Sequence, residues 1–193
     1  MPEPRIASDL PGNETIPKAF SELRANTLIA LGDQQHALVA VTSPNQAEPR
    51  RHVAAYLAAA IAQTGCRVLL VDGDTDGEHQ PDHHQDLTGS APHVVSESLS
   101  VATSHAVKVN DSTLLSSQAS LVALQDQASQ YDVLILAAPP VLSVADTRTL
   151  TSVADGTLLV VAHGKSNRED SVRASEILRR TNANLLGAVV IKN

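Results

Sequence analysis

Five short runs of consecutive apolar residues constrain the fold of this chain more than any other feature. They span residues 37–43, 67–73, 132–138, 157–163 and 185–191. Unbroken apolarity is typical of strands that are buried on both faces of a sheet. Helical patterns lie between them, at residues 52–65, 120–130 and 168–182. Because strand and helix alternate, the sequence predicts an α/β fold in which a mostly parallel central sheet is flanked by helices.

Two further segments have weaker patterns. A helix is expected over residues 17–31, ended by Gly32. Residues 99–103 are a candidate sixth strand, and the helix at 168–182 is expected to turn Val172, Ile177 and Leu178 inward.

The N-terminal end differs in composition from the rest. Residues 1–16 contain three prolines and little apolar bulk, which predicts a flexible arm. The sequence therefore predicts one folded domain over residues 17–193.

Composition excludes several function classes. Aromatic residues make up 2% of the 193 residues, so base-stacking and sugar-stacking platforms are not available. A net charge of -7 argues against nucleic-acid binding. The single cysteine, Cys66, cannot form an internal disulfide, and no apolar run is long enough to span a membrane. We expect a cytoplasmic domain whose partners are proteins or small molecules.

The polar loop after the first apolar run has the layout of a phosphate-binding loop. A buried strand, the loop and an Ala-rich helix follow one another, so that amides at a helix N-terminus would face an anion. Working loops read G-x-x-x-x-G-K-[ST], where glycine permits the tight backbone, lysine contacts the outer phosphates and the hydroxyl binds magnesium. This chain has other residue types at those positions: Pro44, Asn45, Ala47, Pro49, Arg50, Arg51 and His52.

Several motifs in the same order give the chain a resemblance to a known family. Residues 18–26 are similar to E-A-F-R-x-L-R-T-N. The phosphate loop of the family, T-S-P-x-P-G-E-G-K-S-T, is matched by residues 42–52, its second motif, an apolar run followed by D-x-D, by residues 68–74, and its third, Y-D-x-x-I-I-D-T-P-P-V-L-x-V-A-D, by residues 131–146. Residues 155–161 are similar to a further motif, D-G-x-L-L-V-V. Over residues 17–193 the chain resembles the bacterial tyrosine kinase domains that accompany chain-length regulators of capsule and exopolysaccharide synthesis, relatives of MinD-type and ParA-type ATPases. The resemblance implies a P-loop NTPase-like fold.

The departures from the family motifs predict a loss of catalysis. Pro49 removes an amide donor where the motif has glycine, Arg50 replaces a compact lysine by a planar fork, and Arg51 removes the hydroxyl that would bind magnesium. Ala137 stands where the third motif has its aspartate. Because phosphoryl transfer depends on positioning and charge stabilisation, neither turnover nor a bound cofactor is expected, with ATP and magnesium as the alternative.

Two carboxylates remain from the second family motif. Asp72 and Asp74 follow the second apolar run, and the resemblance associates the first of them with metal and catalysis. They form an incomplete set, so we interpret them as a solvated turn and expect no metal. Arg50, Arg51 and His52 are likewise interpreted as an exposed basic turn, and a small-anion site there is left open.

Residues 72–86 offer two weaker metal hypotheses. Their start is similar to a calcium loop, but His83 stands where that loop needs glutamate. His79, His83 and His84 could bind zinc adventitiously. A solvated loop is the favoured interpretation.

The resulting hypothesis is a pseudokinase that acts as an interaction or regulatory module in capsule or exopolysaccharide synthesis. Its expected partner is a membrane chain-length regulator, met at the inner face of the plasma membrane, and its own membrane contact is only indirect. The family's ring-forming E-x-x-R-x-x-R motif is matched only at Arg24, so the oligomeric state stays open. Two alternatives also stay open: a divergent active tyrosine autokinase or ATPase, and a MinD-like or ParA-like adaptor.

Overall fold

A computed structural model describes residues 5–12, 15–46, 48–73, 92–103, 118–164 and 166–192. Its elements, in chain order, are η1 (Arg5–Asp9), α1 (Lys18–Leu31), β1 (Ala37–Thr42), α2 (Arg50–Ala62), β2 (Val68–Asp72), β3 (His93–Ser96), β4 (Leu99–Thr103), α3 (Gln118–Ala128), β5 (Val133–Ala137), α4 (Asp146–Ser152), β6 (Gly156–Ala162), α5 (Arg168–Arg180) and β7 (Leu185–Ile191). None of these helices is long and apolar enough to cross a bilayer.

The strands form one seven-stranded sheet in the order β3-β4-β2-β5-β1-β6-β7. Every neighbouring pair is parallel except β3 with β4. The predicted α/β fold with a mostly parallel sheet is therefore confirmed. All residues of β1, β2 and β5 are buried, as their unbroken apolar runs predict. The candidate sixth strand is also confirmed, because β4 pairs with β2.

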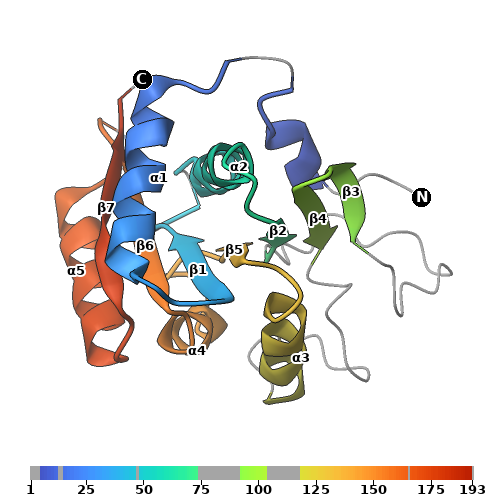
Figure 1. The fold of residues 1–193 in the computed structure, drawn as a ribbon. Helices are drawn as coiled ribbons and strands as arrows, with labels where there is room; N and C mark the ends of the chain where they lie inside the picture. Colours follow the sequence, from blue (N-terminus) through green and yellow to red (C-terminus); the bar gives the residue numbers. More distant parts are fainter. Residues whose placement is uncertain are drawn as a thin grey trace, which may run out of the picture.

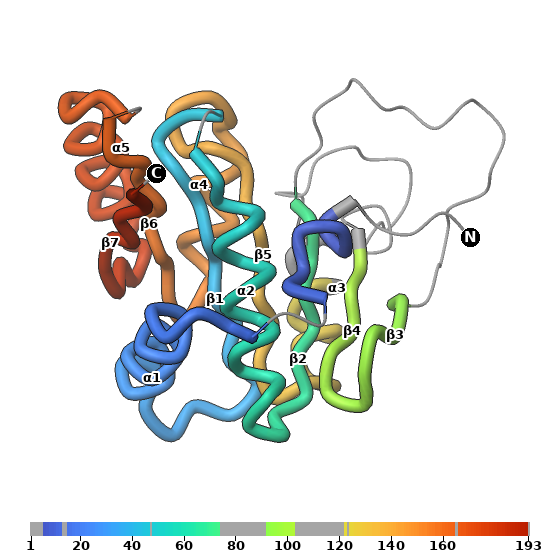
Figure 2. The backbone as a smooth tube through the Cα atoms, turned by 90° about the horizontal axis from the view of Figure 1, so that it is seen from above, coloured from blue at the N-terminus to red at the C-terminus, as the bar shows by residue number. Residues whose placement is uncertain are grey.

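Helices cover both faces of the sheet. Figure 1 shows η1, α1 and α2 over one face and α3 and α4 under the other. Alternate residues of β1 supply the two resulting cores: Val39 and Val41 pack with the residues of α2, and Leu38 and Ala40 pack with those of α3 and α4. Figure 2 shows the molecule from above: β7 is the last strand at the left of the sheet, and α5 lies beside it.

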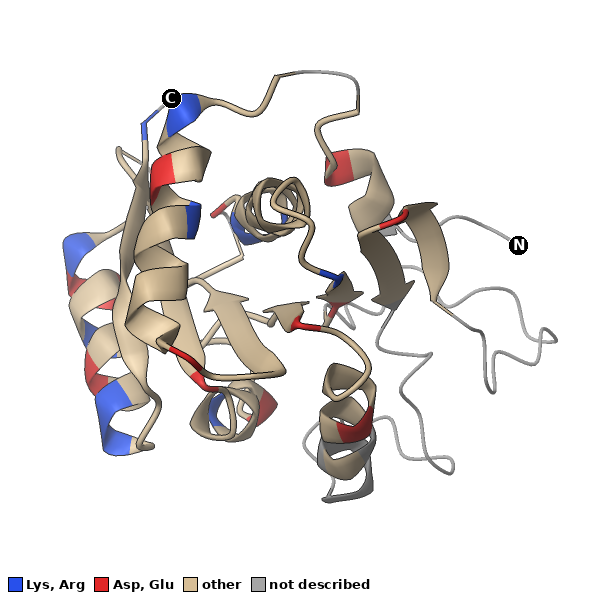
Figure 3. Ribbon diagram, in the orientation of Figure 1, with Lys and Arg blue, Asp and Glu red and all other residues tan. Residues whose placement is uncertain are grey.

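The structure differs from the sequence-based expectation at two short elements and one side chain. β3 is exposed along its whole length, and α4 has only seven residues, so neither has a long apolar pattern. Val172 of α5 is 48% exposed, whereas Leu178 is buried and Ile177 is partly buried, as expected, and Ala174 is the further buried residue of this helix. Charged residues of both signs cover the outer side of α5 (Figure 3).

The N-terminal segment contributes to the packing. Within the stretch that composition predicts to be a flexible arm, η1 places Ile6 in the core with α2, and Ile6 has no exposed surface. Leu10 packs against the same core. The buried isoleucines of this stretch, Ile6 and Ile16, are too far apart to give a periodic signal, so the sequence does not predict this contact. The domain boundary at residue 17 stays a prediction.

Two aspartates that match family motifs hold the starts of strands, at the edge of the sheet opposite the motif loop. Asp155 accepts a hydrogen bond from the Leu38 amide at 2.7 Å. Asp132 accepts one from the Arg67 amide at 2.8 Å and pairs with the Arg67 guanidinium at 3.0 Å. The hydrogen bonds from Arg67 lower the pKa of Asp132, and the same contact raises the pKa of Arg67. These residues are structural.

We expect Asp132→Asn to lower the free energy of unfolding at pH 7 by about 1 kcal/mol, because the contact is largely exposed. The pKa of Asp132 is depressed in the folded chain, so its contribution is present above the unfolded pKa and disappears as pH falls through the folded pKa. Urea denaturation at pH 7 and at about pH 3 measures this. The difference between wild type and variant should shrink in acid, and a difference that grows in acid would contradict the assignment.

Candidate functional site

The candidate site lies where β1, β5 and β2 end. These strands are neighbours, and Ala137 at the end of β5 is in register with Val41 of β1 and Asp72 of β2. The chain leaves β1 toward α2 on one face of the sheet, and leaves β5 toward α4 on the other face. Open α/β sheets bind ligands at such a point, outside the carboxyl ends of the strands. The residues of the degenerate motifs are brought together here.

The loop after β1 is held by its own hydrogen bonds. Glu48, 4% exposed, accepts a bond from the Asn45 amide at 3.1 Å and another from the Ser166 hydroxyl at 2.8 Å. The Asn45 side chain donates to Asp170 at 2.9 Å. Glu48 therefore ties the loop to the β6–α5 connection. Ser166 is 118 residues away in the chain, so local sequence patterns give no signal for this contact.

A second set of bonds joins this loop to the one after β5. The Val141 amide donates to the Ser43 carbonyl at 2.9 Å, and the Thr42 hydroxyl donates to the Pro139 carbonyl at 2.6 Å. Pro44, at the first motif position, is buried directly after Ser43, and its carbonyl accepts a bond from the Leu142 amide at 3.2 Å. The two loops thus form one fixed rim of the site.

Arg50 does not form the exposed turn that the sequence analysis expects. Its side chain is the first of α2 and is 2% exposed, and its Nε donates to the Ala138 carbonyl at 3.0 Å. The correction has a physical reason: an arginine at the start of α2 reaches the backbone just after β5, where a carbonyl accepts its proton. The lysine position of the motif is therefore filled by a guanidinium bound to the protein itself.

Asp72 is not a solvated turn residue either. Its side chain is 8% exposed and pairs with the Arg51 guanidinium at 3.0 Å. The same guanidinium lies 3.6 Å from Asp9 of η1, and the Arg51 side chain is 20% exposed. Arg51 Nε is buried and has no hydrogen-bond partner among the described residues. Sequence reasoning missed Asp9, because nothing in residues 1–16 marks one aspartate as special.

The position of the missing third-motif aspartate lies beside this ion pair. Ala137 is fully buried and its carbonyl accepts a bond from the Gly73 amide at 3.0 Å. A Cβ on Gly73 would come within 2.8 Å of that carbonyl oxygen, so the backbone after β2 and β5 packs closely. Among the described residues, no three His, Cys, Asp or Glu side chains gather to hold a metal ion.

The remaining predicted residues fall into two groups. His52 is exposed on α2, and its ring lies 4.3 Å from that of Tyr56. Pro49 directly precedes α2 and accepts a bond from the Val53 amide at 3.0 Å. The others lie outside the described residues: Ala47, Asp74, His79, His83 and His84. The two metal hypotheses for residues 72–86 therefore stay predictions.

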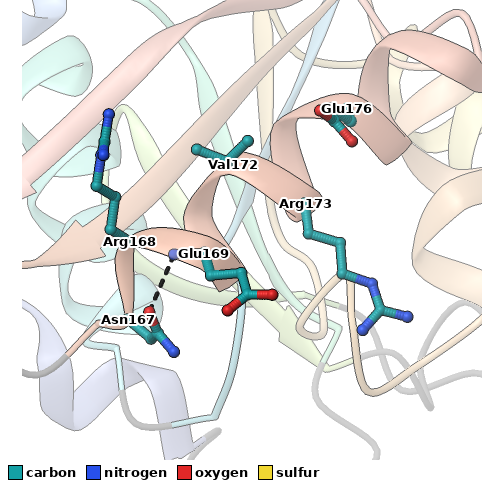
Figure 4. Close-up of a pocket in the computed structure, with 6 residues that line it drawn as sticks. All are labelled: Asn167, Arg168, Glu169, Val172, Arg173 and Glu176. Carbon is teal, nitrogen blue, oxygen red and sulfur yellow. Dashed lines mark hydrogen bonds between the residues drawn. The ribbon is translucent and has the colours of Figure 1, made fainter.

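A separate hollow runs along one side of α5. Figure 4 shows its six lining residues, which are the capping residue Asn167 and, on α5 itself, Arg168, Glu169, Val172, Arg173 and Glu176. Asn167 caps the helix by accepting the Glu169 amide at 3.0 Å, and the other polar residues are two arginines and two glutamates. Because its charges balance and its lining residues come from one short segment, this hollow offers no set of side chains for catalysis.

No protein-family model matches this chain. It is 32% identical to tyrosine-protein kinase YwqD of Bacillus subtilis, over 89% of this chain and 78% of that one. It is 29% identical to tyrosine-protein kinase CpsD of Streptococcus pneumoniae, over 86% and 80% of the two chains.

Solved structures give the same result for the fold. The chimerical protein CapA2B2 superposes with a TM-score of 0.75 at 26% identity, over 92% of this chain and 85% of that one. The MinC:MinD complex of Aquifex aeolicus superposes with a TM-score of 0.56 at 18% identity, over 80% and 68% of the chains, which shows a shared fold alone. The predicted P-loop NTPase-like fold and the resemblance to MinD-type ATPases are confirmed.

The expectation that no cofactor is bound is wrong. Relatives of this chain are tyrosine-protein kinases, and such enzymes use ATP with magnesium. The altered residues Pro49, Arg50, Arg51 and Ala137 do not by themselves remove the whole ligand site, because the N-terminus of α2 and two guanidinium groups remain. A nucleotide is therefore the ligand whose fit to these residues has to be examined.

The described residues fit the phosphate groups of a nucleotide but not its magnesium ion. The N-terminus of α2 and the guanidinium groups of Arg50 and Arg51 favour a phosphate group. The magnesium ion does not fit the arrangement seen: Asp72 is paired with Arg51, residues 50–52 have no hydroxyl, and Ala137 has no carboxylate. We derive no reaction step through that ion.

Proposed function

Because the chain belongs to the family of bacterial tyrosine-protein kinases, as 32% identity to YwqD over most of both chains shows, we propose that it is a catalytically degenerate member that acts as an interaction or regulatory module. The observation that carries the proposal is the ion pair between Arg51 and Asp72. It engages the one described carboxylate that the family motif associates with catalysis.

Charge and geometry support the loss of transfer. Phosphoryl transfer needs cations that follow the developing charge on the transferred group. Here the Arg50 Nε is bound to a backbone carbonyl and the Arg51 guanidinium lies between two carboxylates. Neither arginine can move onto a transferred phosphoryl group without giving up a buried contact, and such losses are costly.

In this proposed function the nucleotide remains a ligand of the chain and has a structural role. Phosphates at the N-terminus of α2 would hold together the loops after β1 and β5, which already share the rim of the site. A nucleotide that is bound and not consumed stabilises the fold by mass action, by an amount that rises with the logarithm of its concentration once this exceeds the dissociation constant. Binding, not turnover, would then be the signal that a partner detects.

The proposed partner is a membrane chain-length regulator of capsule or exopolysaccharide synthesis, which the chain would meet at the inner, cytoplasmic face of the membrane. The similarity to CapA2B2, a chimerical protein, supports a partnered domain. Within this proposal residues 17–193 form a single P-loop-like kinase domain, and η1 packs onto it through Ile6.

The test is transfer of radiolabelled phosphate from ATP in the presence of magnesium to a tyrosine-containing copolymer and to the chain itself. We expect no labelling above background, with YwqD as the positive control. A variant that restores the motif residue types (Pro49→Gly, Arg50→Lys, Arg51→Ser and Ala137→Asp) should regain labelling if it folds, because it returns the glycine, lysine, hydroxyl and carboxylate together.

Labelling of the wild-type chain that is lost in Asp72→Asn would contradict the proposal and establish the second candidate, a divergent active kinase. Family membership is the observation that favours this second candidate. In that case Arg50 would have to replace the motif lysine, so Arg50→Met should abolish labelling. Exposed Arg173→Met on α5 is the matched control, because it removes a guanidinium far from the motif loop.

A further inference from the structure

We propose that the Arg51 guanidinium serves as the cation of this site in place of a metal ion. Because it is paired with Asp72, the chain binds a nucleoside polyphosphate without magnesium. This inference rests on the proposed function, because it takes the nucleotide to bind at the N-terminus of α2. It goes beyond the loss of transfer, since it specifies which form of the nucleotide the site accepts.

The carboxylate that a metal ion would need is already occupied. The Asp72 side chain is 8% exposed, and the Arg51 guanidinium lies 3.0 Å from its Oδ2. A magnesium ion demands near-ideal octahedral geometry and would need this oxygen. To bind Asp72, the ion would have to displace a side chain that is itself four-fifths buried, which would leave a buried arginine without its principal partner.

A second carboxylate, on η1, helps to hold Arg51 in place. Asp9 lies 3.6 Å from the same guanidinium, on the side of η1. η1 is fixed by Ile6, which has no exposed surface and packs in the core with α2. The guanidinium is therefore held from two elements, and an arginine fork held in this way loses little further freedom on binding an anion.

The charge of Arg51 also acts against a metal ion. A magnesium ion at Asp72 would lie beside the Arg51 guanidinium, and two cations so close together repel each other. Phosphate oxygens that no metal engages, as in free ADP, would instead bind to the amides at the N-terminus of α2. Adding magnesium to the solution should give no gain in affinity, because it complexes the free nucleotide and finds no carboxylate that is ready to receive it.

The experiment is calorimetric titration of the full chain with ADP and with ATP, once in EDTA and once in excess magnesium chloride. For the wild type we expect dissociation constants in magnesium that are equal to or higher than those in EDTA. For Arg51→Ser we expect binding in EDTA to fall by about tenfold and magnesium to restore it, because Asp72 is released and a motif hydroxyl is present. The control is exposed Arg173→Ser, which should behave as wild type.

A second measurement does not depend on nucleotide. Manganese, a paramagnetic substitute for magnesium, is titrated into each variant and followed by electron paramagnetic resonance. We expect no bound manganese in the wild type and detectable binding in Arg51→Ser. If Arg51→Ser does not fold, Asp9→Asn takes its place, because loosening the outer anchor should raise manganese binding in the same direction.

Three outcomes overturn the inference. Tighter nucleotide binding in magnesium by the wild type, with no phosphate transfer, refutes the role of Arg51 and leaves the proposed function intact. An unchanged ratio of the two dissociation constants in Arg51→Ser refutes it in the same way. No nucleotide binding under either condition refutes both this inference and the nucleotide ligand of the proposed function.

Discussion

Ile6→Ala is expected to lower the free energy of unfolding by about 2–4 kcal/mol. Ile6 is fully buried in the core with α2, and the short element η1 offers few other apolar groups to refill the space. For a domain of this size the melting temperature should fall by about 2–4 °C for each kcal/mol lost. Thermal and urea denaturation followed by circular dichroism measure the change.

The matched control is Ile29→Ala, the same truncation on α1 at a side chain that is 78% exposed. It should change the free energy of unfolding by no more than about 0.5 kcal/mol. If Ile6→Ala were as neutral as this control, residues 5–12 would not belong to the folded unit, and Asp9 would lose the anchor that brings it to Arg51.

Asp72→Ala is expected to destabilise the chain by about 2–4 kcal/mol, because it leaves the largely buried Arg51 guanidinium with only its longer contact to Asp9. The sign of this effect is informative. At a site built to receive a metal, removing a carboxylate from the empty protein commonly stabilises it, since catalytic groups are held at a cost in stability. Urea denaturation without metal or nucleotide measures the difference.

The double variant Arg51→Met, Asp72→Leu is the control for this interpretation. Replacing both partners of a buried ion pair by apolar side chains is often neutral, so the double variant should recover most of the stability that Asp72→Ala loses. A stable Asp72→Ala would mean that the pair contributes nothing, and Asp72 would then be available to a metal ion.

The sheet could be predicted from the sequence because its central strands are buried on both faces. The unbroken apolar residues of β1, β2 and β5 leave few alternatives to a parallel sheet. β3 and α4 were not predicted because the first is wholly exposed and the second has seven residues, too few for a helical period to repeat reliably.

The location of the candidate site could be predicted from the sequence, but the contacts between its residues could not. The motif spacing brings Arg50, Arg51, Asp72 and Ala137 to one edge of the sheet, as the structure has them. Their burial could not be predicted, because it depends on contacts between distant parts of the chain. Asp9 reaches Arg51 and Ser166 reaches Glu48 only after the sheet has formed.

Long-range packing also decides what a single motif residue does in the folded chain. An arginine after a proline at a helix start is typical of an exposed turn, and only the nearby end of β5 turns Arg50 inward to the Ala138 carbonyl. In the same way Asp132 and Asp155 match family motifs without touching the site, because both fix the starts of strands at the opposite edge. A matched motif residue is therefore not by itself a catalytic residue.

The central claim is that Arg51 holds Asp72 in a kinase fold that binds a nucleotide and no longer transfers its phosphate. Crystals grown with ADP and manganese test it most directly, since anomalous scattering locates the metal. The account predicts phosphates at the N-terminus of α2, the Arg51 guanidinium still on Asp72 and no anomalous peak between them. A manganese ion bound to Asp72, with Arg51 displaced, would contradict it.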